Sequence, residues 1–351
     1  MALKVLLAHE HFPPEVRGGG EYVVFETARG LIERGVDLRV LTTGNPALRE
    51  YQGVPTTRLP ISRYALNLQA GRIAQEAQGA ALIHAFNYHA ALPALAAGRR
   101  LGIPVVCSIL GLFGPTWREM RGPILGRAFE ALERRIVSWP YARTIFLSEA
   151  SRRAGIAMGA RATASTVIAP SIDLARFRPA SARDDAIVFA GQLDRRKGFH
   201  HVMAAARALP HLRFRALGWA PDVAALRAAA PANLDIVEDR GSPAYTEGLS
   251  RARIFFFPSY AETFGIVVAE AMASGCAVVS TLDTLDFAGA KVAPGDEAGM
   301  IEALARLAAD PTGAEAAGME NHRRAEAYGQ DIIVTKIMRT YAEVIAGKGP
   351  P

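Results

Sequence analysis

Two glutamates, Glu262 and Glu270, lie eight positions apart in a stretch whose residue types suit the binding of a long polar ligand. If the segment between them were wholly helical, the two side chains would be about 12 Å apart along the axis, at about 1.5 Å per residue. That span suits a ligand with hydroxyl groups at both ends and a phosphate in the middle. A sugar nucleotide has this layout.

The phosphate position follows from the elements that the glutamates flank. The apolar run 254–257 predicts a buried strand, and residues 266–273 have the composition of a helix. The backbone N–H groups of Phe264, Gly265 and Ile266 would then point outward, at a helix end that carries about half a unit of positive charge. We therefore expect an anion to bind at this turn.

Two other loops join a predicted strand to a predicted helix. Gly18, Gly19 and Gly20 would allow the backbone to approach phosphate oxygens, although a plain flexible loop is the alternative. The glycines do not form G-x-G-x-x-G, so a dinucleotide site is not predicted. Lys197, next to Gly198 at the start of a predicted helix, could stabilise a leaving diphosphate as a preorganised cation.

These residues resemble a known family. Residues 262–265 (Glu-Thr-Phe-Gly) and 270–273 (Glu-Ala-Met-Ala) are similar to the E-x7-E signature of family 4 glycosyltransferases, which have the GT-B fold and retain the anomeric configuration. The resemblance implies that Glu262 and the backbone after it hold the transferred sugar, and that Glu270 accepts hydrogen bonds from the ribose. An ordinary strand–turn–helix with two solvated glutamates is the alternative.

The resemblance extends to other loops. Residues 191–198 are similar to the family's G-R-L-x-x-x-K-G loop, which makes Lys197 a diphosphate partner and, with Glu262, a predicted catalytic residue. Gly19 and Gly20 fall in a loop that faces the diphosphate and the acceptor. The other predicted donor-binding residues lie in loops near the diphosphate and the base, and are Gln192, Arg196, Glu238 and Arg240.

The sequence departs from the family pattern at three places. Gln192 stands where the family has arginine and cannot offer a bidentate cation, although Arg195 or Arg196 could supply the charge unless they belong to a solvated basic loop. Leu110 stands where a donor-side histidine is usual. Residues 281–287 replace the G-G-x-x-E turn. His11 or His89 could line the acceptor side instead, although each is more often a structural histidine.

The order of the predicted elements indicates an α/β fold with parallel sheets. We predict a GT-B architecture of two Rossmann-like, doubly wound domains that face a cleft. The boundaries are 1–172 for an acceptor-side domain, 173–185 for a linker, 186–330 for a nucleotide-sugar domain, and 331–351 for a C-terminal helix that crosses back. The last two helices are expected near residues 298–308 and 331–346.

Composition limits the classes of partner. The chain has 351 residues and a net charge of +6, which suits anionic substrates or an anionic membrane surface. Neither a membrane-spanning run nor a signal peptide is expected, and the cysteines, Cys107 and Cys276, are predicted to be buried and reduced, as in a cytoplasmic protein. Without D-x-D or metal-site spacing, we expect neither a catalytic metal nor a cofactor.

Residues 99–178 hold thirteen arginines against five acidic residues. Within them, residues 117–139 combine basic and apolar side chains on a predicted helix, which could lie on the inner membrane face and meet a lipid-linked acceptor. A core-packed helix with a solvated basic face is the alternative. Nucleic-acid binding is not predicted, because no recognised module is present.

The sequence therefore predicts a metal-independent, retaining hexosyltransferase that uses a nucleotide-diphosphate sugar and a saccharide or lipid-linked acceptor, as in polysaccharide biosynthesis. Gln192 and Leu110 keep an alternative open, namely a catalytically silent sugar-nucleotide-binding or scaffold protein of the same fold.

Overall fold

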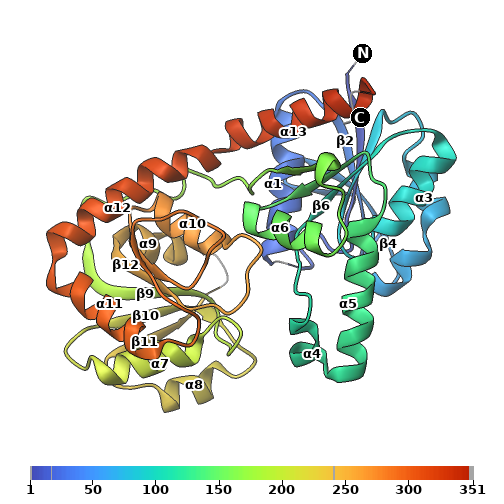
Figure 1. Ribbon diagram of the computed structural model, residues 1–351. Helices are drawn as coiled ribbons and strands as arrows, with labels where there is room; N and C mark the ends of the chain where they lie inside the picture. The colour runs from blue at the N-terminus through green and yellow to red at the C-terminus, as the bar shows by residue number, and fades with distance from the viewer. Residues whose placement is uncertain (1, 17, 240–241, 348–351) are drawn as a thin grey trace. The chain divides into compact units, whose positions relative to one another are not determined.

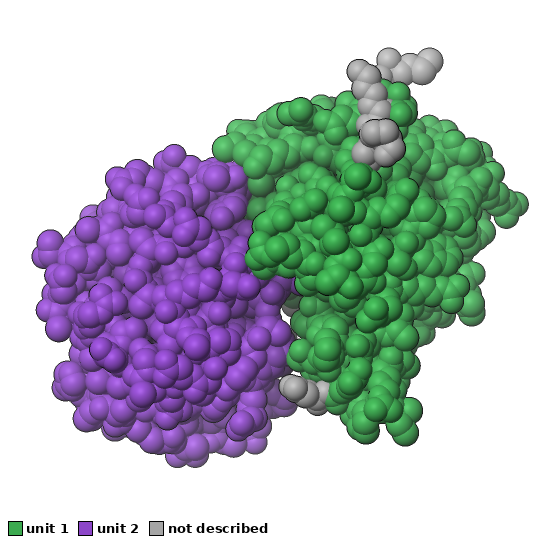
Figure 2. All heavy atoms as spheres, viewed as in Figure 1, with its two compact units in different colours: residues 1–171, 330–351 green, residues 172–329 purple. Residues whose placement is uncertain are grey.

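The computed structural model describes residues 2–16, 18–239 and 242–347. They form two compact units (Figure 2). Unit 1 consists of residues 1–171 and 330–351, and unit 2 of residues 172–329. Each unit is built around one predominantly parallel sheet, as the alternation of strands and helices predicted.

The sheet of unit 1 has eight strands in the order β3-β4-β2-β1-β5-β6-β7-β8 (Figure 1). All neighbours pair in parallel except β3 and β4, which form an antiparallel hairpin that the sequence analysis did not predict. The strands are β1 (Lys4–Ala8), β2 (Asp37–Thr43), β3 (Glu50–Tyr51), β4 (Val54–Leu59), β5 (Leu82–Phe86), β6 (Val105–Ile109), β7 (Arg143–Phe146) and β8 (Ser165–Val167).

Helices cover both faces of this sheet. The helices of the unit are α1 (Gly19–Glu33), α2 (Ala70–Glu76), α3 (Ala91–Leu101), α4 (Thr116–Arg121), α5 (Pro123–Ser138), α6 (Glu149–Ala157) and α13 (Gln330–Ile345), with 3-10 turns at Arg63–Leu68 and Ala162–Ala164. Alternate residues of β1 separate the two cores: Leu6 and Ala8 pack with α3 and α5, whereas Val5 and Leu7 pack with α1 and α13.

The C-terminal helix α13 packs directly on α1. A Cβ atom at Gly30 of α1 would lie 2.4 Å from Cγ2 of Val334, so glycine permits the close approach. Tyr341 is fully buried, and its hydroxyl is 2.6 Å from Nδ1 of His84 on β5. The other ring nitrogen of His84 is 2.8 Å from Oγ of Ser108, so this histidine links α13 to the centre of the sheet.

The sheet of unit 2 is entirely parallel, in the order β11-β10-β9-β12-β13-β14. The apolar runs in its central strands are buried on both faces, as expected for a parallel sheet covered by helices. The strands are β9 (Asp184–Gln192), β10 (Phe214–Trp219), β11 (Leu234–Glu238), β12 (Ala252–Phe257), β13 (Ala277–Ser280) and β14 (Gly289–Lys291).

Three helices of unit 2, α8, α9 and α12, were not predicted from the sequence. Both α9 and α12 begin with a capping residue followed by proline, Ser242-Pro243 and Asp310-Pro311, and each capping side chain accepts a hydrogen bond from a backbone N–H. The helices of this unit are α7 (Phe199–Ala208), α8 (Val223–Ala229), α9 (Pro243–Arg251), α10 (Ile266–Ala273), α11 (Glu297–Ala309) and α12 (Pro311–Ala325), with a 3-10 turn at Glu326–Tyr328.

Residues 173–185, predicted as a linker, belong to unit 2. Phe177 is buried. The guanidinium of Arg183 donates to the carbonyl oxygens of Ser250, Ala252 and Ser274, which lie at the ends of α9 and α10. The prolines and the missing periodicity suggested a connector, whereas the segment is held by contacts with residues distant in the sequence.

The predicted basic helix is interrupted. Gly122, with φ of +79°, separates α4 from α5. Trp117 is buried and stacks on Phe129 with ring centroids 4.8 Å apart, so part of the apolar surface faces inward. Ile124 and Leu125, at the start of α5, are instead 86% and 52% exposed. Among the described residues, no helix is both long and apolar enough to cross a lipid bilayer.

Candidate active site

The two residues predicted to be catalytic, Glu262 and Lys197, form an ion pair in unit 2. Their side chains are 14% and 17% exposed, so the pair is largely shielded from water. Oγ of Ser259 donates to the same carboxylate oxygen at 3.1 Å. Nζ of Lys197 also lies 5.6 Å from the ring centroid of Phe257, at the end of β12. The fold therefore brings together two charges that are far apart in the sequence.

A close approach of two loops holds this pair. Gly198 has φ of +75°, and a Cβ atom there would lie 2.0 Å from the carbonyl oxygen of Pro258. The amide of Tyr260 donates to the carbonyl of Arg196 at 3.0 Å, and the amide of Lys197 donates to Oδ1 of Asp194 at 2.8 Å. Glycine is required here because any side chain would separate the loops.

The sequence predicts an anion site at the start of helix α10. Its first residue is Ile266, and Gly265 precedes it in the left-handed conformation, with φ of +97°. As a glycine, Gly265 provides no side chain to cap this N-terminus. Phe264 is buried with its ring centroid 5.3 Å from that of Tyr328, so it contributes backbone rather than side-chain chemistry. The amide of Val268 donates back to the carbonyl of Gly265 at 2.9 Å, which leaves the amides of Gly265 and Ile266 as groups from which an anion can accept.

Glu270 lies within α10, whereas Glu262 precedes the helix, so the two glutamates do not share one helical face. Glu270 is only 7% exposed, and Oη of Tyr245 donates to its Oε2 at 2.6 Å. Burial raises the pKa of Glu270 to about 7, and the Tyr245 hydrogen bond acts in the opposite direction. The carboxyl group therefore titrates near neutral pH.

Three other predicted donor-side residues, Gln192, Arg196 and Glu238, lie at or just beyond the carboxyl ends of strands of unit 2. Gln192 ends β9 and is in register with Trp219 of β10. Arg196 is half-buried beside the Lys197 loop. Glu238 ends β11 and is exposed, and Arg240 lies outside the described residues. Ligands of open α/β sheets bind at this edge of the sheet.

In unit 1, the glycine loop begins helix α1. Gly18 is the residue before the helix and has an extended conformation, and Gly19 and Gly20 form the first turn. A Cβ atom at Gly18 would be 2.6 Å from Oε2 of Glu21, so a carboxylate already lies near this helix end. A Cβ atom at Gly20 would be 3.5 Å from Cδ1 of Leu110, which places that leucine against the loop.

His11 and His89 belong to a polar cluster at the same edge of the sheet. The pKa of each histidine is lowered, and burial is the main cause of this shift. The carboxylate of Glu10 accepts hydrogen bonds at 3.1 Å from the amides of Tyr88 and His89. The side-chain nitrogen Nδ2 of Asn67 donates to the backbone carbonyl of Tyr64 at 3.0 Å and lies 2.8 Å from Nδ1 of His89. This pattern assigns Nδ1 as the acceptor, so the proton of the neutral His89 ring is on Nε2.

A buried carboxylate organises the loop after β6. Glu133 of α5 is fully buried, and its oxygens accept four hydrogen bonds. The donors are Oη of Tyr88 at 2.5 Å, the amides of Phe113 at 3.0 Å and Gly114 at 2.7 Å, and Nε1 of Trp117 at 2.9 Å. Asn87 holds the start of this loop, because its side chain accepts from the amide of Leu110 at 2.7 Å and donates to the carbonyl of Gly111 at 2.7 Å.

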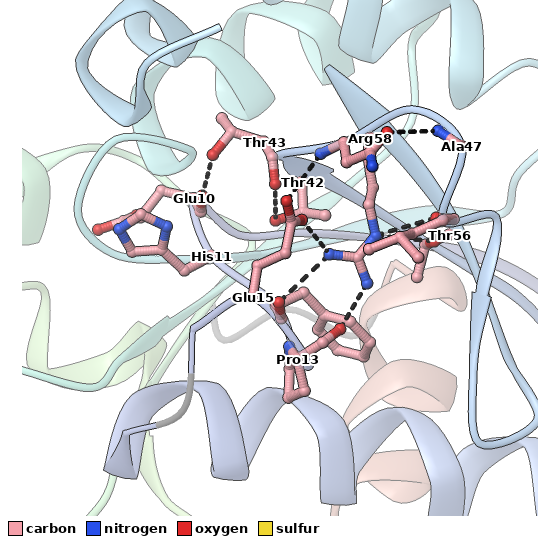
Figure 3. A network of polar contacts seen from close by, with 12 residues as sticks. Glu10, His11, Pro13, Glu15, Thr42, Thr43, Ala47, Thr56 and Arg58 are labelled. Atoms are coloured by element: carbon pink, nitrogen blue, oxygen red, sulfur yellow. Dashed lines mark hydrogen bonds and ion pairs between the residues drawn. The ribbon is translucent and has the colours of Figure 1, made fainter. Parts of the chain in front are cut away.

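A buried arginine performs the same task for the loop before α1. Figure 3 shows Arg58 among Pro13, Glu15 and Thr56. Its guanidinium pairs with the Glu15 carboxylate at 2.8 Å and donates to the carbonyl oxygens of Phe12 at 3.3 Å and Leu48 at 3.0 Å, and also to that of Pro13. The loop that leads to Gly18 is thus tied to strand β4.

The sequence analysis did not identify Tyr245, Glu133, Arg58 or Asn87 as contributors to these sites. For Tyr245 a signal was present, because the Ser242-Pro243 pair marks the start of its helix. The other three act through partners 10 to 46 positions away, and single-sequence patterns do not report such distant contacts.

Comparison with known proteins gives a family match in each unit. The family description "Glycosyl transferase 4-like domain" matches residues 18–171, and "Glycosyl transferases group 1" matches residues 184–310. Alpha-maltose-1-phosphate synthase of Mycolicibacterium smegmatis is 24% identical, with 98% of this chain and 100% of that protein covered.

Two solved structures illustrate the similarity of fold. Sucrose-phosphate synthase from Thermosynechococcus elongatus has a TM-score of 0.80 and 20% identity over 98% of this chain and 100% of that one. HepE of Anabaena in complex with UDP-glucose has a TM-score of 0.78 and 18% identity over 97% of this chain and 100% of that one.

The fold is therefore that of the GT-B glycosyltransferases, two parallel-sheet α/β domains. With a glycosyl transferase 4-like domain followed by a group 1 domain, the chain is a glycosyltransferase of the group 1 type.

Proposed function

We propose that this protein is a metal-independent, retaining hexosyltransferase that moves a hexose from a nucleotide-diphosphate sugar to a saccharide or lipid-linked acceptor. The observation that carries the proposal is the Lys197–Glu262 ion pair, which lies in unit 2 together with the start of α10, where Gly265 is the residue before the helix. The matches to two glycosyl transferase domains support the transfer of a sugar. HepE, which is similar in fold, is described in complex with UDP-glucose.

The ion pair suggests an exchange of partners when the donor binds. Lys197 would turn from Glu262 to the diphosphate, and Glu262 would then accept hydrogen bonds from sugar hydroxyls. Lys197 and the amides of Gly265 and Ile266 would together stabilise the negative charge that grows on the leaving diphosphate. These groups provide the positive charge that a metal ion supplies in other transferases, which is why we propose a metal-independent reaction.

In the proposed reaction, the bond between the anomeric carbon and the diphosphate oxygen breaks while the acceptor oxygen attacks from the same face. The acceptor hydroxyl gives its proton to the departing phosphate oxygen. Because the attack is on the same face, the configuration is retained without a protein nucleophile. Glu270 would accept hydrogen bonds from the ribose hydroxyls, and the amides at the E-x7-E turn would orient the donor.

On the acceptor side, we propose roles for His11 and His89 of unit 1. Burial keeps the pKa of both histidines low, so each would be neutral at physiological pH. With its proton on Nε2, His89 would donate a hydrogen bond to a ligand oxygen and would not act as a general base. Leu110, beside Gly20, gives the loop an apolar contact where a histidine is usual in the family.

The test is a panel of nucleotide sugars (UDP-glucose, ADP-glucose, GDP-mannose and dTDP-glucose), with binding measured by calorimetry and transfer by product NMR. We expect one to bind, to react in the presence of EDTA, and to give a product of the same anomeric configuration. Loss of transfer in EDTA that Mg²⁺ restores would refute the metal-independent mechanism. An inverted product would refute retention, and binding without turnover would indicate a binding role.

We also propose that the start of α5 meets an anionic membrane on the cytoplasmic side. Ile124 and Leu125 are exposed, and Arg121 and Arg127 flank them. Figure 1 shows α4 and α5 extending from the sheet of unit 1. Apolar insertion combined with basic side chains is the pattern of interfacial helices. The protein should float with vesicles that contain phosphatidylglycerol, and an Ile124→Ser, Leu125→Ser variant should remain at the bottom of the gradient. Equal flotation of the two proteins would refute this surface.

A further inference from the structure

We propose that Tyr245 is a positioning residue for donor binding, because its hydroxyl fixes the orientation of the Glu270 carboxylate. The inference rests on the proposed role of Glu270 at the ribose. Oη of Tyr245 is 2.6 Å from Oε2 of Glu270 inside unit 2, and both side chains are buried, with exposed fractions of 8% and 7%. At this distance the phenol donates to the carboxyl oxygen.

The position of Tyr245 is itself fixed. It lies in the first turn of α9, whose start is set by the Ser242 cap and by Pro243. Its ring packs edge-on against Phe177, with centroids 6.2 Å apart. Phe177 is buried and belongs to the segment that the sequence suggested was a linker. The tyrosine hydroxyl is therefore presented to Glu270 by a helix end and by an aromatic wall.

The consequence for the ligand is geometric. A carboxylate has about four acceptor positions on two oxygens. Because Tyr245 occupies a position on Oε2, the ribose hydroxyls would be received by the remaining positions, including those of Oε1. Without the phenol, the Glu270 side chain would lose the contact that selects its rotamer. The carboxylate would then have to be ordered during binding, which weakens affinity.

The same contact affects proton binding at Glu270. The groups that influence this carboxyl are the Tyr245 hydroxyl and the charge of Arg176, and both lower its pKa against the larger effect of burial. Removing the Tyr245 hydrogen bond should therefore raise the pKa of Glu270 above its present value of about 7. Since the proposed ribose acceptor is the ionised form, the midpoint of donor binding should move to higher pH.

The experiment compares wild type, Tyr245→Phe and Glu270→Gln. Each binds the tightest nucleotide sugar of the panel above between pH 5.5 and 8.5, and binding is measured by calorimetry. We expect Tyr245→Phe to bind about 3- to 10-fold more weakly at pH 8, which is the scale of one hydrogen bond, with its affinity midpoint at higher pH than wild type. Glu270→Gln should bind more weakly still and show no such midpoint.

Glu247→Gln is the matched control, because it changes a charge on the same helix with a side chain that is 70% exposed. Its affinity and its midpoint should equal those of wild type. A ¹³C NMR titration of Glu270 in the ligand-free proteins measures the pKa directly, and should give a higher pKa in Tyr245→Phe.

The outcomes separate the two proposals. If Glu270→Gln binds the donor as tightly as wild type, Glu270 is not at the ribose and the proposed site is wrong. If Glu270→Gln weakens binding but Tyr245→Phe leaves both the affinity and the midpoint unchanged, the positioning role of Tyr245 is refuted. A weaker Tyr245→Phe with an unmoved pKa would mean a merely structural role and would also refute it.

Discussion

The two units present loops at the carboxyl ends of similar parallel sheets, but they fix those loops by different means. In unit 2, the Lys197 and Glu262 loops meet through a glycine, backbone hydrogen bonds and a single ion pair. In unit 1, buried charged side chains hold the loops, with Arg58 before α1 and Glu133 after β6. The charges of Lys197 and Glu262 in unit 2 can therefore bind a ligand, whereas those of Arg58 and Glu133 in unit 1 bind other groups of the protein.

The largest expected effect concerns the available charge of unit 2. Lys197→Met should lower kcat by about 10²- to 10³-fold, the effect of removing one group that stabilises a developing anion. Global stability should fall only moderately, because the shielded Glu262 carboxylate loses the lysine but keeps the hydrogen bond from Ser259. Steady-state kinetics and urea unfolding measure the two quantities. Lys291→Met, the same change at an exposed position of β14, is the control and should retain most activity; unchanged kcat in Lys197→Met would remove the basis for the proposed mechanism.

Unit 1 should respond in the opposite way. Glu133→Gln places an amide among four hydrogen-bond donors, so at least one buried donor loses its acceptor. We expect the free energy of unfolding to fall by about 2–3 kcal/mol, from one unsatisfied group and the lost charge. Urea unfolding followed by circular dichroism tests this. Glu130→Gln, one turn away and paired with Arg118 at a more exposed position, is the control and should cost less than about 1 kcal/mol.

The comparison also predicts opposite pH dependence of stability in the two units. Burial raises the folded-state pKa of Glu270 to about 7. The contribution of Glu270 to the free energy of unfolding is therefore greatest at a pH below the pKa of the unfolded chain, and it is lost as the pH rises toward 7. The folded-state pKa of His84 is lowered to about 3 by burial, so stability in unit 1 is lost as the pH falls below about 6.5. Each effect amounts to about 2 kcal/mol between pH 7 and pH 5.

Native-state hydrogen exchange resolved by peptide measures the opening free energy of each unit separately at these two pH values. Glu270→Gln should remove the loss of stability at high pH from unit 2 only, and His84→Gln the loss at low pH from unit 1 only. Identical pH slopes in wild type and in both variants would show that neither group controls stability.

The smallest expected effect refines the account of unit 1. Tyr341→Phe removes the hydroxyl that contacts His84 but keeps the buried ring. The cost should be about 1 kcal/mol, the net value of one hydrogen bond, plus part of the penalty for a histidine nitrogen left without its partner. Thermal unfolding measures it, with Tyr64→Phe, a half-exposed tyrosine, as the control. A loss above about 3 kcal/mol would mean that α13 itself had detached.

The sequence by itself determined the alternation of strands and helices, the fold class, and the candidate residues that lie next to a strand–helix junction. Lys197 and Gly265 could be identified because they lie at strand-to-helix junctions, which short-range patterns report, whereas the role of Glu262 was implied by the resemblance to the E-x7-E signature. The helices α9 and α12 carried an equally local signal, a capping residue before proline, and could have been predicted from it.

The tertiary structure alone decided how these groups are held. It paired Lys197 with Glu262, placed Tyr245 on Glu270, and drew residues 173–185 into unit 2 through Phe177 and Arg183. A buried charge or hydroxyl must find partners wherever the packed chain presents them, because leaving it unpaired is costly. Those partners are distant in the sequence. The residue types therefore indicated which groups could take part in the chemistry, and the packing determined which of them are in contact.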